Sequence, residues 1–328
     1  MSAVSLGDTA VVGKLLCDDI ELTTGALNSI TFKNDITILS QDEECAVHIG
    51  TIVTNQGRRS VAVGDDAGTT SQGQNAVAIG HRAGQGSQTQ NAVAIGNNAG
   101  EVGQKDSAVA VGLFAGKTNQ GLHSVGIGLQ AGETNQGDFA VSVGENAGQV
   151  TQGDYAVAIG HNAGDNNSSD YAIAIGDNAG QQTQGENSIA IGVGAGQNSQ
   201  LENSIAIGLN AGLETQQENS VAIGHDAGDF IQQENCVAIG YEAGKTNQEE
   251  NAVAIGAGAG KGLAPPTGQG QHLNSIIINA RGNTVPLNSV QASSFYVAPI
   301  RGFANPAGGV ANTLWYDTAT FEVMYHIP

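Results

Sequence analysis

A block of sixteen residues is repeated through most of this chain. The glycine that closes the sequence Val-Ala-Ile-Gly, or a close variant of it, recurs every sixteen residues in thirteen copies from Gly64 to Gly256, and an outlying copy ends at Gly50. Self-similarity at a fixed period is typical of a solenoid, in which each repeat forms one coil and packs against the coils beside it. The repeat therefore limits the fold to a stack of similar coils.

Each repeat predicts two short strands and two corners. Small residues alternate with Val or Ile before the glycine, as in Ser220 to Ile223, and this period of two is that of a β-strand. The second residue after the glycine is often Asn, Asp or Gly, which accept the positive φ of a corner. Gln recurs four residues after each Ala-Gly pair, except at Ser168, and stacked Gln side chains can form an amide ladder. We therefore expect an all-β fold, a parallel β-solenoid with sixteen-residue coils.

The composition suggests one competing interpretation, a disordered low-complexity tract. The chain has 48 Gly among its 328 residues, and aromatic residues make up only 4% of it. A disordered tract has no physical reason to keep Val or Ile at two fixed places through thirteen copies. The solenoid is therefore the favoured interpretation.

Charge and cysteine content exclude several classes of partner and site. The net charge of −20 would repel phosphate backbones, so nucleic acid is not an expected partner. Cys17, Cys45 and Cys236 lie far apart, which argues against a disulfide framework and against a metal site, and Cys236 fits as a small packing residue. We expect no cofactor. The sequence also suggests neither a membrane span nor a secretion signal.

We expect several solenoids to associate. Burial of two columns of Val and Ile contributes less free energy than the conformational entropy that is lost when the repeats become ordered. Small side chains let backbones approach closely, so the face that carries Ala and Ser is the predicted contact. We expect a homotrimer, with an interface that includes Ala190, Ala206, Ala222 and Ala238. His48 stands in the same column, so three copies could meet on the axis and hold a metal or an anion, although a polar cap of the first coil is the simpler interpretation.

The repeat resembles the head repeats of trimeric autotransporter adhesins of the YadA type. The resemblance is carried by NSVAIGHDAG and its relatives and covers residues 45–260. It implies a left-handed parallel β-roll assembled as a trimer. The period of sixteen is longer than is usual in that family, and the expected stalk and membrane anchor have no counterpart here, so autotransport itself is not implied.

Three further segments flank the repeats. Residues 1–44 are predicted to form a small β cap or attachment segment, and residues 261–273 a loop rich in Pro and Gly. Residues 274–328 hold half of the aromatic residues, and NTLWYDTATFEVMYHIP predicts a hairpin turning at residues 317–320. This last segment is similar to parts of fibre proteins of large DNA viruses and phages. Its rings are expected to set the register of the trimer or to contact a receptor: Phe295, Tyr296, Trp315, Tyr316, Phe321 and Tyr325.

One column of acidic residues is a candidate cation site. It runs without interruption through eight repeats from Asp138 to Glu250. One carboxylate per coil is too few for Ca²⁺, which takes six or more oxygens, so a solvated corner whose charges oppose aggregation is the simpler interpretation. No Ser, His and Asp set or other catalytic group stands out, and we expect the protein not to be an enzyme.

These observations favour a structural fibre or spike protein of a virion. We expect a trimer that joins a capsid or virion base at one end and a host receptor or glycan at the other. The absence of a secretion signal favours the virion surface, since a virion protein is made in the host cytoplasm. The alternatives are the head of a cellular trimeric adhesin or another binding solenoid.

Overall fold

The computed structural model describes residues 46–50, 54–262, 270–284, 286–299, 314–316 and 323–325. The chain divides into two units, residues 1–41 and residues 42–328, and all described residues belong to the second. The predicted cap at residues 1–44 therefore lies outside the described residues. The strands below account for all regular structure in the described part of the chain, which contains no helix.

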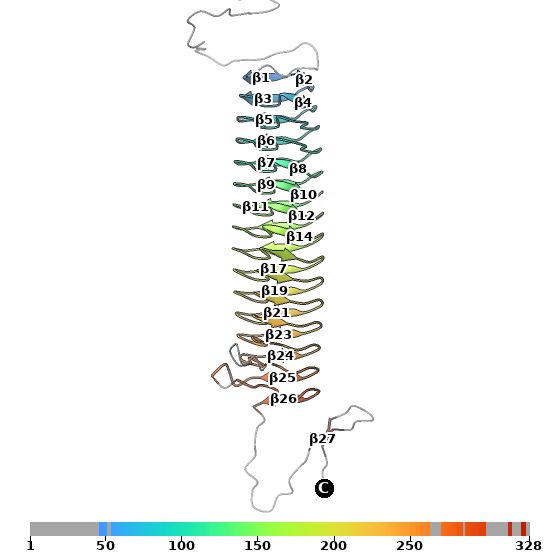
Figure 1. The fold of residues 1–328 in the computed structure, drawn as a ribbon, viewed down its shortest axis with the longest axis vertical. Coiled ribbons are helices and arrows are strands. Elements are labelled where there is room, and N and C mark those ends of the chain that lie inside the picture. Colours follow the sequence, from blue (N-terminus) through green and yellow to red (C-terminus); the bar gives the residue numbers. More distant parts are fainter. Residues whose placement is uncertain are drawn as a thin grey trace, which may run out of the picture. The chain divides into compact units, whose positions relative to one another are not determined.

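Parallel strands stack on one another along the described repeats (Figure 1). The larger sheet, called sheet A, has sixteen strands. In spatial order they are β1 (Val47–Gly50), β3 (Val61–Gly64), β5 (Val77–Ile79), β6 (Val93–Ile95), β7 (Val109–Val111), β9 (Val125–Ile127), β11 (Val141–Val143), β13 (Val157–Ile159), β15 (Ile173–Ile175), β17 (Ile189–Ile191), β19 (Ile205–Ile207), β21 (Val221–Ile223), β23 (Val237–Ile239), β24 (Val253–Ile255), β25 (Ile276–Asn279) and β26 (Phe295–Ala298).

A second parallel sheet, called sheet B, is formed by the strands that end in the Gln column. Its eight strands are β8 (Thr118–Gln120), β10 (Thr134–Gln136), β12 (Val150–Gln152), β14 (Asn166–Ser168), β16 (Thr183–Gln184), β18 (Ser199–Gln200), β20 (Thr215–Gln216) and β22 (Ile231–Gln232). Two pairs of strands stand outside these sheets: β2 (Thr54–Gln56) with β4 (Thr70–Gln72), which are parallel, and β27 (Leu314–Tyr316) with β28 (Val323–Tyr325), which are antiparallel. The last pair confirms the predicted hairpin.

The register of sheet A follows the sequence repeat. Val61 pairs with Val77, and the same offset of sixteen residues holds through most of the sheet. The predicted parallel β-solenoid with sixteen-residue coils is therefore confirmed. It does not end at Gly260 as the sequence suggested, because Val253 pairs with Ile276 and Ile276 with Phe295. Two longer coils thus continue the same sheet beyond the predicted boundary.

Alanine fills the interior of each coil. The middle residue of each sheet A strand points inward and meets the Ala of the Ala-Gly pair, so that Ala190 and Ala195 are both fully buried in one cluster. The predicted trimer contact on the alanine column is therefore wrong. Its four residues have no exposed surface even in a single chain: Ala190, Ala206, Ala222 and Ala238.

The Gln column forms the amide ladder that the sequence predicts. Gln104 is typical, since its side-chain amide donates to the carbonyl oxygen of Val93 at 2.8 Å and to Oε1 of Gln120 at 3.0 Å. Gln88 donates to Oε1 of Gln104 in the same way. Buried polar groups are costly unless they are bonded, so the ladder satisfies most of the Gln side chains that close the alanine interior. Among the described residues, Oε1 of Gln184 and Oε1 of Gln200 have no hydrogen-bond partner. The ladder is interrupted at Ser168, whose hydroxyl group bonds locally to the carbonyl oxygen of Gly164.

The glycine that defines the repeat is required by geometry at the end of the sheet A strands in the regular coils. Gly192 has a φ of +131°, and a Cβ atom there would lie 2.5 Å from the carbonyl oxygen of Gly208 in the next coil. Neither the backbone conformation nor the space admits a side chain. Close stacking of coils therefore explains why this residue is Gly in every repeat from Gly64 to Gly256.

Candidate functional site

The outer face of sheet A carries an exposed aliphatic surface, called here the Val/Ile stripe. It consists of the first and third residues of each strand, which point away from the alanine interior. The third-position isoleucines leave between 36% and 41% of their surface exposed: Ile79, Ile95, Ile127, Ile159, Ile175, Ile191, Ile207, Ile239 and Ile255. No described segment of the chain covers this stripe, and contiguous apolar surfaces of this kind typically mark interaction sites.

The stripe continues over the two C-terminal coils. Ile276 and Ile278 are 42% and 37% exposed, and Phe295, which stacks on Ile276, is 61% exposed. Phe295 was predicted as a tip residue and is indeed exposed. Its neighbour Tyr296 points the other way, packs against the alanine interior, and accepts a hydrogen bond from the backbone amide of Val290 at 3.0 Å. Tyr296 therefore closes the interior of the last described coil instead of belonging to an exposed tip.

The remaining predicted tip residues cannot be placed against a partner. Trp315, Tyr316 and Tyr325 lie in the hairpin strands, whose side chains are not described, and Phe321 lies outside the described residues. Their role stays a prediction.

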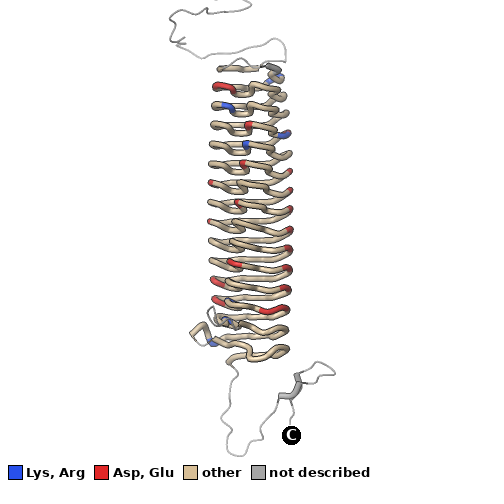
Figure 2. Tube along the Cα trace, viewed as in Figure 1, with Lys and Arg blue, Asp and Glu red and all other residues tan. Residues whose placement is uncertain are grey.

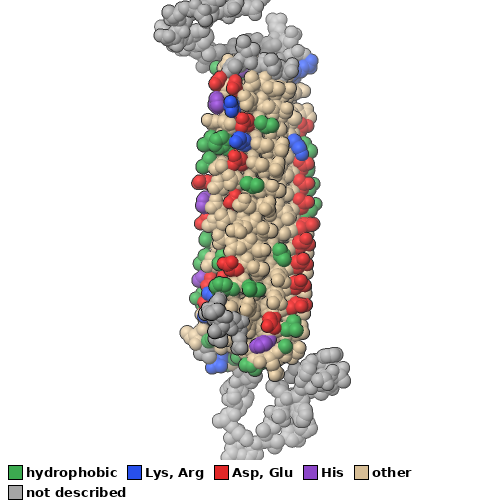
Figure 3. Space-filling view, in the orientation of Figure 1, with side chains coloured by type: hydrophobic (Ala, Val, Ile, Leu, Met, Phe, Trp, Pro, Cys, Tyr) green, Lys and Arg blue, Asp and Glu red, His purple; other side chains and the backbone are tan. Residues whose placement is uncertain are grey.

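The acidic column lies along one edge of the stacked coils, where acidic positions are red along the trace in Figure 2 and acidic side chains form a red row in Figure 3. Asp138, Asp154 and Asp170 each accept a hydrogen bond at 2.8 Å from a backbone amide of the preceding coil. The amide of Leu122 and the nearby Lys105 hold the pKa of Asp138 below its ordinary value. The first part of the column therefore stabilises the corner, while each carboxylate keeps its second oxygen for other contacts.

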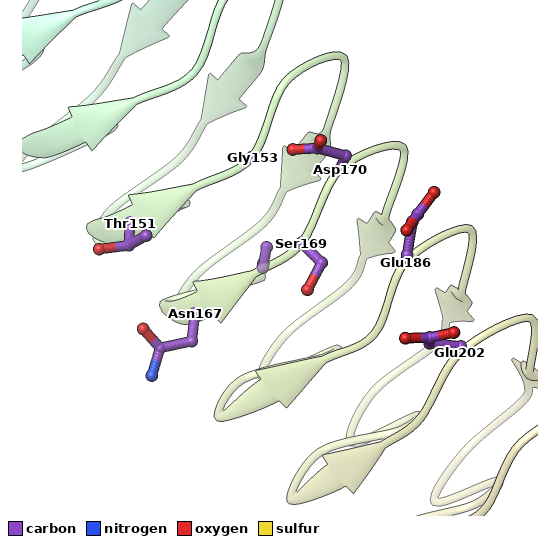
Figure 4. A pocket seen from close by; sticks show the side chains of 8 residues that line it. Thr151, Gly153, Asn167, Ser169, Asp170, Glu186 and Glu202 are labelled. Atoms are coloured by element: carbon purple, nitrogen blue, oxygen red, sulfur yellow. The ribbon is translucent and has the colours of Figure 1, made fainter.

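A shallow, open hollow lies beside this column where the Gln ladder is interrupted. It is lined by Ser168, Asn167 and Thr151 together with three carboxylates from successive coils. The carboxylates of Asp170, Glu186 and Glu202 follow one another along the corner rather than surrounding a common point (Figure 4). This arrangement suits contact with an extended ligand better than coordination of a single ion.

An aromatic ladder accompanies the acidic column. His123, Phe139, Tyr155 and Tyr171 occupy the same corner position in four successive coils, and the last three each follow a residue of the acidic column. Their rings stack with centroids 5.1, 4.9 and 5.2 Å apart, and the last two pairs are within 5° of parallel. Phe139, Tyr155 and Tyr171 remain 45%, 48% and 51% exposed. The rings thus form a continuous apolar ridge on the surface.

The backbone at this ridge is in the left-handed conformation, which bulky residues disfavour. The φ values of Phe139 and Tyr155 are 60° and 59°, and the same position in the next five coils is held by Asn, which tolerates this conformation. The conformation costs a residue with a Cβ atom about 1–2 kcal/mol, while an aromatic pair contributes about 0.5–1.5 kcal/mol. Stacking therefore roughly offsets the strain, and stability alone does not explain the rings.

This ladder was not among the predicted sites, although the signal for it is visible in the repeat. Ring side chains at positions 123, 139, 155 and 171 replace Asn at a period of sixteen. The solenoid brings these four rings together although they lie sixteen residues apart in the sequence.

Two histidine positions bear on the metal prediction. His48 pairs with Ala62 in sheet A and so belongs to the column that points into the coil. The prediction that three copies could meet on a trimer axis is therefore wrong, because that column is not on an outer face. Within the described ranges, Asp65, Asp66 and His81 are the one set of three potential ligands whose atoms lie within 4.8 Å of one another.

A network of charged groups joins the last regular coils to the longer ones. Lys245 contacts Asp226 at 2.7 Å and Glu242 at 3.1 Å, and Lys261 contacts Glu242 at 2.6 Å. Burial alone would raise the pKa of Glu242, but hydrogen bonds from Lys261, Lys245 and Asn283 lower it to about 2. Burial, with the charge of Asp226 nearby, raises the pKa of Asp229 to about 6. Asp229 is therefore the unfavourable member of the network.

Replacing Asp229 by Asn should stabilise the solenoid above pH 7 and have little effect near pH 4. An elevated folded pKa means that the folded state loses stability as the pH rises from the ordinary carboxyl value to about 6. The gain at pH 8 is at most about 3 kcal/mol, since one pKa unit corresponds to about 1.4 kcal/mol. Thermal unfolding at the two pH values measures it, with the exposed Glu186→Gln as a control. A variant that loses stability at pH 8 would show that the charge of Asp229 is favourable.

Comparison with known proteins identifies part of the repeat. A family model described as the YadA head domain repeat matches residues 56–83, 136–163 and 182–195. A search of curated proteins gave no match. No helix among the described residues is long and apolar enough to span a lipid bilayer. The matched ranges begin near the first coils and recur in the middle of the stack, so these parts of the solenoid are similar to YadA head repeats.

Proposed function

We propose that this chain is the trimeric head of an adhesin-like surface fibre, held together along the Val/Ile stripe. YadA-type heads are trimeric adhesins, and the matched repeats support the same class of function here. The observation that carries the proposal is the stripe itself, a row of Val and Ile side chains along sheet A in which most of the third-position isoleucines are exposed. A function of this class is structural and requires no catalytic group or cofactor.

The stripe suits association better than the small-residue face predicted from sequence. A fully buried Ile contributes about 1.5–3 kcal/mol relative to an exposed one, and every coil offers two branched side chains. Three chains around an axis would cover these rows with copies of themselves. The acidic column and the aromatic ladder lie in the turns that lead from a sheet B strand to the following sheet A strand.

The fibre is proposed to belong to a virion and to mediate attachment to a host surface. The support is the similarity of residues 274–328 to parts of viral and phage fibre proteins. In this proposal one end joins the capsid or virion base and the other contacts a receptor or glycan. The head of a cellular trimeric adhesin is the alternative, favoured by the YadA repeats alone.

Immunogold electron microscopy with antibodies against residues 45–260 separates the two. Labelling of virus particles, together with loss of particle adsorption in the presence of the antibody fragments, is the expected result. Labelling confined to cell envelopes would reject the virion and support the cellular adhesin.

A further inference from the structure

The surface formed by the aromatic ladder and the acidic column has an organisation that the fold does not need. Four coils carry rings where five later coils carry Asn, and the rings are stacked, exposed and held in a conformation that favours Asn. The same corner position without rings forms equally well in the later coils, such as those containing Asn203 and Asn219. The rings therefore change the surface and not the backbone.

The charge beside the ladder is negative and is largely unbalanced by the residues that the structure describes. Lys105, 3.0 Å from Asp138, is the one cation paired with the column among the described residues. Asp154, Asp170 and the following five glutamates are exposed and stand in successive coils. Like charges in such a row repel one another, so a positively charged partner would relieve the repulsion as well as gain contacts.

We propose that the ladder and the flanking carboxylates form a binding site for an extended, arginine-rich polypeptide segment. The guanidinium group is planar, stacks on aromatic rings, and bonds to carboxylates through two parallel N–H groups. Both kinds of partner lie here within one residue of each other in three coils, as Asp138 with Phe139, Asp154 with Tyr155 and Asp170 with Tyr171. The open hollow lined by Asp170, Glu186 and Glu202 extends the site toward the C-terminal coils (Figure 4).

The site does not depend on the oligomeric state of the protein, or on whether the fibre belongs to a virion or to a cell. It uses only groups from one chain, and its rings and most of its carboxylates are exposed. A neutral glycan is the competing ligand, since sugars also contact rings and carboxylates. The charge of the column favours the cationic segment, because a glycan gains nothing from eight acidic coils in a row.

The test measures binding of labelled oligo-arginine to the full chain, with oligo-lysine of equal length as the comparison. Arginine should bind more tightly than lysine, because both neutralise carboxylates but the planar guanidinium also stacks on rings. The triple variant Phe139→Asn, Tyr155→Asn and Tyr171→Asn should weaken arginine binding at least about tenfold and remove its advantage over lysine. Its melting temperature should change by no more than about 2–4 °C.

A second variant separates the local site from general attraction to the acidic column. Asp154→Asn, Asp170→Asn and Glu186→Gln remove three charges at the ladder, while Asn keeps the oxygen that accepts the backbone hydrogen bond. Glu218→Gln, Glu234→Gln and Glu250→Gln remove the same number of charges farther along the column. The first set should weaken binding of oligo-arginine more than the second.

Three results would overturn the proposal. If the two peptides bind equally and the Asn variant binds them as well as the original protein does, the interaction depends on net charge alone and not on the rings. Preferential binding of a neutral oligosaccharide that is lost in the Asn variant would make the surface a glycan site. Dissociation of assembled protein by the Asn variant would make the ladder a subunit contact.

Discussion

Replacing Ile175, Ile191 and Ile207 together by Glu should convert the proposed trimer into folded monomers. The three side chains lie in successive coils on the Val/Ile stripe and are 36% exposed in the single chain. In an assembled trimer the new carboxylates would be buried without partners, at a cost of several kcal/mol each. In a monomer they would face water. Sedimentation velocity gives the oligomeric state, and far-ultraviolet circular dichroism shows whether the solenoid persists.

The matched control places the same charges on the other sheet. Val150→Glu, Asn166→Glu and Gln182→Glu introduce three carboxylates at exposed positions around sheet B. This control should remain trimeric. A stripe variant that is still a trimer would show that the interface lies elsewhere.

Replacing Ala190, Ala206 and Ala222 together by Leu should unfold the coils that contain them. These residues are fully buried within one chain and pack against the second alanine of each coil, so larger side chains have no space. Overpacking typically costs about 1–3 kcal/mol per site, and three adjacent coils would be affected. Thermal unfolding and limited proteolysis should show early loss of residues 189–223. The contrast with the stripe variant is direct, because that variant loses assembly and keeps its fold.

A well-folded monomer from the alanine variant would contradict this account. It would mean that the alanine column contacts another chain, as the sequence first suggested. The two triple variants therefore assign the inner and outer faces of sheet A by independent measurements.

The period of the sequence was sufficient to predict the solenoid. It predicts the offset by which Val61 meets Val77, the Gln ladder and the corners, because each of these depends only on residues stacked at a spacing of sixteen. The hairpin near the C-terminus was also predictable, from alternation on both sides of a turn.

Alternation alone does not predict which face of a sheet A strand points into the coil. Both faces of a sheet A strand are apolar, one with Ala and the other with Val or Ile, and the larger aliphatic side chains usually point inward. Here the interior already holds the Gln ladder, and a Cβ atom at Gly196 would lie 2.6 Å from Oε1 of Gln200. In the sixteen-residue coils this narrow interior admits only small side chains beside the ladder, Ala with Gly126 and Ser142 as the exceptions, which sends the branched residues outward.

The end of the solenoid was misplaced for a different reason. The offset between Val253 and its partner Ile276 is longer than sixteen residues, and the loss of the sixteen-residue period in the sequence resembled the end of the domain. The pairing of Val253 with Ile276 shows that an insertion leaves the stacking intact. Solenoids tolerate such insertions because each coil contacts only its neighbours.

The most direct test of the account is the mass of the intact protein under native conditions. An assembly held by the Val/Ile stripe predicts three copies of the 33.1 kDa chain, stable on dilution. A species with the mass of one chain at every concentration would contradict it, since the exposed stripe would then have no partner of its own kind.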